Sequence, residues 1–192
     1  MSDEQAFAAL SRRACPPVGE ALFAVAAAWR PVNWGELDRR LDHLALPLFG
    51  AGETGRERAG ALGELLVGDF RPESKAVDGL WLDAVLDTRR GHPVLLAAIA
   101  TELGRRSGWE VAVCSSPTGW FAGLHHDGVL WLVDPTGLAS GDGGVGGDGV
   151  VRRHCAHEIA FVVLTGLAER FTGCEDEAQA RRLRDRLDVF AP

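Results

Sequence analysis

The chain has 192 residues, of which 46% are hydrophobic and 24% are charged, and its formal net charge is -7. A chain of this size buries a core without disulfides or metal, and its acidic balance argues against a nucleic-acid partner, because affinity for phosphates comes from clustered cations. No apolar run approaches the roughly 20 residues that span a bilayer, so we expect no membrane insertion.

The first 72 residues predict a layer of helices. Apolar residues crowd the segment 21–30, and Pro31 ends that helix. Two N-terminal capping signals follow, each with a polar residue three positions before a glutamate: Asn33 with Glu36, and Thr54 with Glu57. We expect an amphipathic helix after each of them.

Residues 73–150 predict a central helix. The segment 71–79 is polar and rich in turn residues, and a short helix is expected over 80–90. A second helix then begins at Pro93, is apolar all round, and ends at Gly108. A helix without a polar face packs on all sides, so we expect it at the centre of the fold.

Three antiparallel strands are expected to back this helix. The segment 109–114 alternates as a strand does, and 115–119 turns the chain back. Asp127 and Gly128 lie between two apolar runs, which is a strong signal for a two-residue hairpin turn. The predicted fold is therefore α+β, with a central helix on a small antiparallel sheet.

Residues 151–192 predict a closing pair of helices. A flexible loop is expected over 139–149, and helix resumes after His154. The second helix of the pair places four apolar side chains on one face: Ala180, Leu183, Leu187 and Phe190. We expect this pair to pack back on the rest of the chain, so that residues 1–192 form a single compact domain.

The cysteines and the first residues indicate a cytoplasmic protein. The cysteines are scattered and form no CxxC pair, which favours four reduced thiols: Cys15, Cys114, Cys155 and Cys174. The opening MSDEQAFAAL lacks the basic and apolar regions of an export signal. Both observations predict a reducing compartment.

The order of helix, strand and hairpin, followed by VDPTG, is similar to the transglutaminase-like core. In that arrangement, as in papain, a cysteine begins the central helix, one strand follows, and the next two strands carry a histidine and an aspartate. The longer pattern resembles the SirB1 family, whose core reads VLxRRxGIPxxL, ELxxRLGLxVxGVxxPGHF and DPxxGG; the matching segments here are VLDTRRGHPVLLAAIATELGRRSGWEVAVCSSPTGWF and WLVDPTG. The likeness extends to the helices on both sides.

The resemblance assigns three positions of a vestigial triad. The nucleophile position falls on Pro93, which has no side-chain heteroatom, and SirB1-type sequences typically carry proline there too. The histidine position falls on Trp120, and the aspartate is kept as Asp134. Loss of nucleophile and base together costs on the order of 10⁶ in rate. We expect a catalytically inactive protein that binds a protein or peptide partner and needs no cofactor.

An alternative is a cysteine hydrolase or acyltransferase with relocated groups. Cys114 ends the first strand, His92 lies at the start of the central helix, and Asp134 remains. A hydrogen bond between His92 and Asp134 is expected as a structural tie or a relic acid–base pair. His125 and His126 alternate across a strand, so only one of them can face the cleft. The candidate cleft residues are His92, Trp120, His125, His126 and Asp134.

The sequence HCAH offers three possible metal ligands, His154, Cys155 and His157. No partner CxxC or HxxxH completes a zinc site, so we expect these residues to begin a helix and to bind no metal. A metal-dependent regulator that uses this motif is a third hypothesis, which metal analysis of the purified protein would test.

Overall fold

The computed structural model describes residues 14–137, 150–173 and 176–187. Its α-helices are α2 (Val18–Ala27), α3 (Trp34–Ala45), α4 (Gly55–Asp69), α5 (Leu82–Thr88), α6 (Pro93–Arg106), α7 (Ala156–Gly173) and α8 (Glu177–Leu187). Its strands are β1 (Arg71–Pro72), β2 (Arg90–Gly91), β3 (Glu110–Ser116), β4 (Gly119–His126), β5 (Val129–Val133) and β6 (Arg152–Arg153). The short 3₁₀ helix η2 (Val77–Leu80) precedes α5. The expected loop 139–149 lies outside the described residues.

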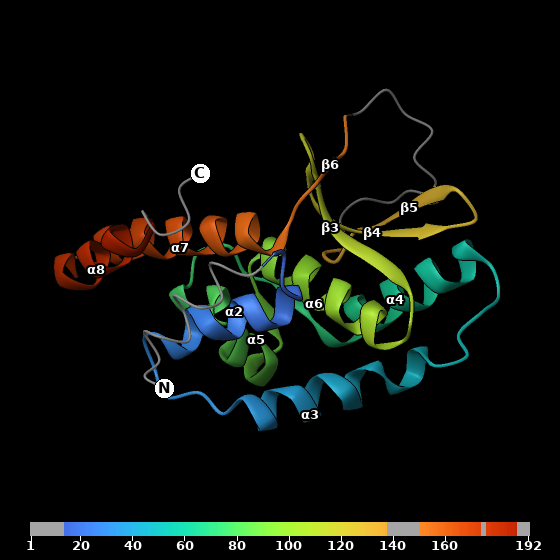
Figure 1. Ribbon diagram of the computed structural model, residues 1–192, viewed down its shortest axis with the longest axis horizontal. Helices are drawn as coiled ribbons and strands as arrows, with labels where there is room; N and C mark the ends of the chain where they lie inside the picture. Colours follow the sequence, from blue (N-terminus) through green and yellow to red (C-terminus); the bar gives the residue numbers. More distant parts are fainter. Residues whose placement is uncertain (1–13, 138–149, 174–175, 188–192) are drawn as a thin grey trace.

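Helix α6 lies at the centre of the described structure, as expected. Every residue from Val94 to Gly104 is buried. The sheet covers one side of α6, and α3 runs along the other (Figure 1). Gly108 ends the helical segment with φ +79°, the left-handed conformation that glycine adopts readily.

The main sheet is antiparallel, with strand order β5-β4-β3-β6. Asp127 and Gly128 connect β4 to β5 with φ of 50° and 76°, which is the type I′ geometry expected for an Asp-Gly hairpin. Strand β6 was not expected, because two exposed arginines carry no alternating apolar pattern. The prediction of a central helix on a small antiparallel sheet is confirmed, with one strand added.

The capping signals of the N-terminal layer are confirmed. The Asn33 side chain accepts a hydrogen bond from the Glu36 N–H, and Thr54 and Glu57 form a complete capping box. The segment 71–79 is more ordered than its turn-rich composition predicts: Arg71 and Pro72 pair in parallel with Arg90 and Gly91, and η2 follows. A two-residue strand leaves no periodic pattern, so the sequence does not reveal it.

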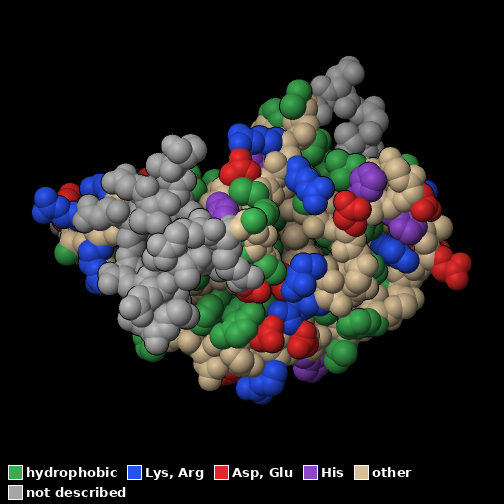
Figure 2. Space-filling view, in the orientation of Figure 1, with side chains coloured by type: hydrophobic (Ala, Val, Ile, Leu, Met, Phe, Trp, Pro, Cys, Tyr) green, Lys and Arg blue, Asp and Glu red, His purple; other side chains and the backbone are tan. Residues whose placement is uncertain are grey.

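The C-terminal pair α7 and α8 packs together, and α7 also contacts α2 and α6. Ala180 and Leu183 are buried, as the predicted apolar face requires, whereas Phe190 lies outside the described residues. On the face shown in Figure 2, arginines and acidic side chains are interspersed rather than gathered into areas of one sign. Among the described helices, none is long and apolar enough to cross a bilayer.

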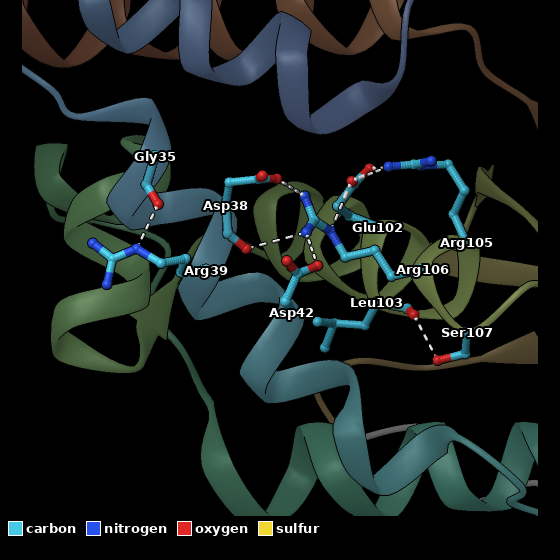
Figure 3. A network of polar contacts seen from close by, with 9 residues as sticks. All are labelled: Gly35, Asp38, Arg39, Asp42, Glu102, Leu103, Arg105, Arg106 and Ser107. Atoms are coloured by element: carbon cyan, nitrogen blue, oxygen red, sulfur yellow. Dashed lines mark hydrogen bonds and ion pairs between the residues drawn. The ribbon is translucent and has the colours of Figure 1, made fainter.

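A network of charges anchors the C-terminal end of α6 to α3 (Figure 3). The Glu102 carboxylate is 2% exposed and accepts hydrogen bonds from Arg105 and Arg106. Arg106 also pairs with Asp38 and Asp42 of α3. A buried charge is tolerated only when it is paired, and this network holds the C-terminal end of α6 against α3. Pro93, at the expected nucleophile position, is at the opposite end of the same helix.

Candidate functional site

Pro93 is the first residue of α6, and His92 caps the helix. Proline suits this position because it has no N–H to satisfy and its fixed φ matches the helix. The Nδ1 atom of His92 accepts a hydrogen bond from the N–H of Val94 at 3.3 Å. The nucleophile position is therefore filled by a residue that begins the helix well and carries no reactive atom.

Trp120 lies near the start of β4, on the face of the sheet that packs on α6. Its cross-strand partner is Ser115. Ser115 shares its face with Val111, which lies against Gly104 of α6, because alternate strand residues point to the same side. The indole is partly buried against the core, and its ring centre lies 5.1 Å from that of His154. Trp120 thus packs where the resemblance places a catalytic imidazole.

Asp134 follows the last residue of β5. Its Oδ1 atom accepts hydrogen bonds from the backbone N–H of Thr136 at 2.8 Å and from the Thr136 hydroxyl at 2.7 Å. Both are local bonds that shape the turn after the strand. Among the residues that the structure describes, no hydrogen bond joins Asp134 to His92, so the expected tie between them is not formed.

His92 instead faces a cavity on the other side of the start of α6. The cavity, of about 330 Å³, is also lined by Arg170 of α7. Burial, together with the positive charge of Arg170, lowers the pKa of His92 from 6.5 to about 4. The imidazole is therefore neutral near neutral pH, and its partners come from α6 and α7.

The structure brings together a Ser–His–Glu group that the sequence did not indicate. The hydroxyl of Ser115 lies 2.7 Å from Nε2 of His154, and the other ring nitrogen, Nδ1, lies 3.7 Å from the Glu158 carboxylate. The His154 side chain is 8% exposed, and burial lowers its pKa. His154 and Glu158 also line a cavity of about 460 Å³. This order is that of a nucleophile, a base and an orienting acid.

Cys114 points away from this group, which corrects the relocated-thiol alternative. It pairs with Phe121 rather than Trp120, so its side chain lies on the other face of the sheet, beside Gly123. The thiol is 2% exposed, and burial raises its pKa. A neutral thiol on the face of the sheet that lies away from α6 is not an activated nucleophile.

His125 and His126 lie at the opposite end of β4 from Trp120. Trp120 and His125 are five positions apart along the strand, which corresponds to about 17 Å. The His125 ring lies 3.8 Å from Glu110, and the His126 ring lies 3.4 Å from Arg58. The hairpin turn therefore holds both side chains at the end of the sheet that lies away from Trp120.

The HCAH residues separate in space. His154 turns toward Ser115 and Trp120, whereas Cys155 provides the backbone carbonyl that begins α7. Within the described ranges, no group of three or more His, Cys, Asp or Glu side chains lies close enough to hold a metal ion. In this structure His154 therefore belongs to the Ser–His–Glu group.

The sequence profile of the transglutaminase-like superfamily matches residues 36–140. This segment covers more than half of the chain and runs from α3 past Asp134, so it contains Pro93, Trp120 and Asp134. His154 and Glu158 lie beyond it. No curated protein and no solved structure matches the chain significantly.

Proposed function

The chain belongs to the transglutaminase-like superfamily, and we propose that it is a SirB1-type member that binds a peptide or another protein and lacks thiol-dependent acyl transfer. The observation that carries this proposal is the pair of side chains at the two triad positions. Pro93 offers no nucleophile at the start of α6, and Trp120 offers no base on β4.

The chemistry of the triad supports the loss of activity. In such sites the helix N-terminus and the imidazole lower the thiol pKa, and the base then moves the proton during acyl transfer. These groups act as a unit, so an aspartate left alone contributes almost nothing to the rate. Asp134 accepts hydrogen bonds from Thr136. These bonds shape the turn and do not need a cysteine or a histidine at the other two triad positions.

The start of α6 supports a binding role. A cavity of about 330 Å³ opens beside His92 and lies within the size range of ligand sites. Phe161 borders it and is 41% exposed, although aromatic side chains of this size are usually covered.

The test combines an activity assay with a binding screen on the full chain. A transamidation assay with a glutamine peptide and a labelled amine should give no product above that of the Asp134→Asn variant. Panning a random peptide library should give a consensus whose binding is lost when Gly166→Ala narrows the cavity, because a Cβ there would lie 3.0 Å from Leu80 and Arg170. Turnover that depends on Asp134, or the absence of any consensus, contradicts the proposal.

A second candidate is a hydroxyl-based esterase, favoured by the Ser115–His154 hydrogen bond. In this reaction Oγ of Ser115 attacks the ester carbonyl while its proton passes to Nε2 of His154. The alcohol then leaves with that proton. Water, deprotonated by the same nitrogen, releases the acid and restores the serine hydroxyl. Because Ser115 lies across from Trp120, the reaction would take place next to the position that the resemblance assigns to the histidine.

A further inference from the structure

Three polar groups line the cavity at the start of α6 without hydrogen-bond partners in the described part of the chain. They are the hydroxyl of Thr165, Nε of Arg170 and Nε2 of His92. The Thr165 and Arg170 atoms are fully buried, so water does not satisfy them at the surface. Buried polar groups nearly always have a partner, and an unsatisfied set around one cavity indicates a missing ligand.

All three groups carry a hydrogen that they can donate. The Nδ1 atom of His92 accepts the N–H of Val94, so the proton of the neutral ring lies on Nε2. Nε of Arg170 carries a hydrogen at any ordinary pH, and a hydroxyl can donate as well as accept. A set of donors selects a ligand that accepts hydrogen bonds, and the guanidinium favours a negative charge.

Arg170 is held by neutral groups. Its two terminal nitrogens donate to the backbone carbonyls of Gly166 and Ser74, at 2.8 and 2.6 Å. No ion pair joins Arg170 to an acidic side chain among the described residues, although Glu169 lies at the rim of the same cavity. Burial lowers its pKa, and the charges of Glu169 and Glu73 offset that effect only in part.

The remaining wall of the cavity is apolar. It is formed by Leu80 before α5, Val94 on α6, and Phe161 and Val162 on α7. A ligand that fills this cavity must therefore place a carboxylate and an apolar group a few ångströms apart. At about 330 Å³ the cavity has room for roughly one residue of a chain.

We propose that this cavity binds the C-terminal residue of a peptide or protein, with its main-chain carboxylate on Arg170, His92 and Thr165 and an apolar side chain against Phe161. Only the C-terminal residue of a chain carries both a carboxylate and a separate apolar side chain. This inference rests on the proposed binding role and names the ligand of that site.

Gly166 supports the assignment of the cavity as a built feature. Glycine in the interior of a helix is unfavourable relative to alanine. A Cβ at this position would meet Leu80 and the Nη1 atom of Arg170, each at 3.0 Å. The absence of a side chain thus lets Arg170 fold back over its own helix and leaves the cavity open.

The experiment measures binding of a fluorescein-labelled Gly-Ser peptide that ends in leucine, by fluorescence anisotropy with the full chain. The matched probes are the same peptide with a C-terminal amide, a peptide that carries an internal glutamate instead, and N-acetyl-leucine as competitor. The free acid should bind, and the amide should bind at least about tenfold more weakly, because a charge-assisted hydrogen bond is lost.

Variants locate the site. Arg170→Gln should weaken binding of the free acid about tenfold to a hundredfold, and Thr165→Val should weaken it less. His92→Asn keeps a helix-capping side chain and removes the imidazole donor. Glu169→Gln at the rim and Arg181→Gln on α8 are the controls, and neither should weaken binding. Circular dichroism of each variant separates loss of ligand from loss of fold.

The outcomes separate this inference from the binding role. Equal binding of acid and amide, both abolished by Gly166→Ala, overturns the carboxylate assignment and leaves the cavity as a peptide site. Stronger binding of the internal glutamate overturns the C-terminal assignment. Binding of N-acetyl-leucine without the peptides assigns the cavity to a small acid and overturns the inference. If no probe binds while library peptides bind elsewhere, the inference fails and the binding role stands.

Discussion

The hydroxyl oxygen of Ser115 lies 2.7 Å from Nε2 of His154, on the inner face of the sheet and beside the ring of Trp120. The two residues come from β3 and from the segment that precedes α7, 39 positions apart in the chain. An imidazole has thus been brought next to the position that Trp120 occupies, but from another part of the fold.

The esterase candidate predicts that a fluorophosphonate labels Ser115. The serine oxygen displaces fluoride from phosphorus, and His154 takes the proton. Mass spectrometry should place the adduct on Ser115. His154→Gln should slow labelling by about 10² or more, the usual contribution of a general base. Ser116→Ala, one position along the same strand, is the control and should label normally. Absence of an adduct on Ser115 removes the esterase candidate and leaves the binding role intact.

The position of Cys114 predicts a coupled pair of mutations. Gly123→Ala would bring a Cβ to 2.6 Å from the Cys114 sulfur, so we expect a loss of about 1–3 kcal/mol in unfolding free energy. In the double variant with Cys114→Ala the clash with the sulfur is absent. The loss of unfolding free energy in the double variant should therefore be smaller than the sum of the losses in the two single variants. Gly60→Ala, which has open space around it, is the control and should stabilise α4 slightly. Strictly additive effects in urea unfolding would place the thiol elsewhere.

We expect the buried carboxylate of Glu102 to contribute strongly to the stability of the protein. Glu102→Gln should lower the unfolding free energy by about 3 kcal/mol, because Arg105 and Arg106 lose a shared buried partner. Arg105→Gln should cost less than about 1 kcal/mol, since the Arg105 side chain is 49% exposed. Denaturant midpoints measure both. Similar losses in the two variants would show that burial of Glu102 does not set its contribution.

His92 predicts a loss of stability in mild acid. Its pKa is about 4 in the folded protein and near 6.5 when unfolded, so between these values the unfolded chain binds more protons. Stability is therefore lost as the pH falls from about 6.5 to about 4. His92→Asn should flatten this part of the profile and leave the region above 6.5 unchanged. His154 has a lowered pKa as well, but it is present in both proteins.

The groups that face His92 set the control for this measurement. Arg170 lowers the His92 pKa through its charge, and Glu169 borders the same cavity. Arg170→Gln should raise the pKa of His92 and reduce the acid sensitivity, whereas a variant at distant His125 should leave it unchanged. A pH profile of His92→Asn that coincides with that of the wild type would contradict the assignment.

Local sequence rules predicted most of the fold. The caps at Asn33 and Thr54, the start of α6 at Pro93 and the Asp127-Gly128 turn each depend on residues a few positions apart, and each is found where expected. The pairings of β1 with β2 and of β3 with β6 join segments that are distant in the chain and only two residues long. Such pairing is decided by tertiary packing, which local patterns do not record.

The candidate site, like the fold, could be predicted from the sequence only where it depends on local motifs. The side chains at Pro93 and Trp120 could be read from the motif, but the position of His154 depends on how the chain returns to β3 before α7. One signal was present: Ser115 is a polar residue on the inner face of a strand, directly across from an aromatic residue. A buried hydroxyl needs a partner, and a search for one could have led to His154.

The contact between Trp120 and His154 has an evolutionary consequence. A histidine at position 120 would remove the indole on which the His154 ring rests, and a cysteine at position 93 would replace the proline that favours the start of α6. Either mutation alone lowers stability and restores no chemistry, because the base and the nucleophile work only together. Single substitutions therefore do not lead from this arrangement to a thiol site, since each first step costs stability and gains no activity.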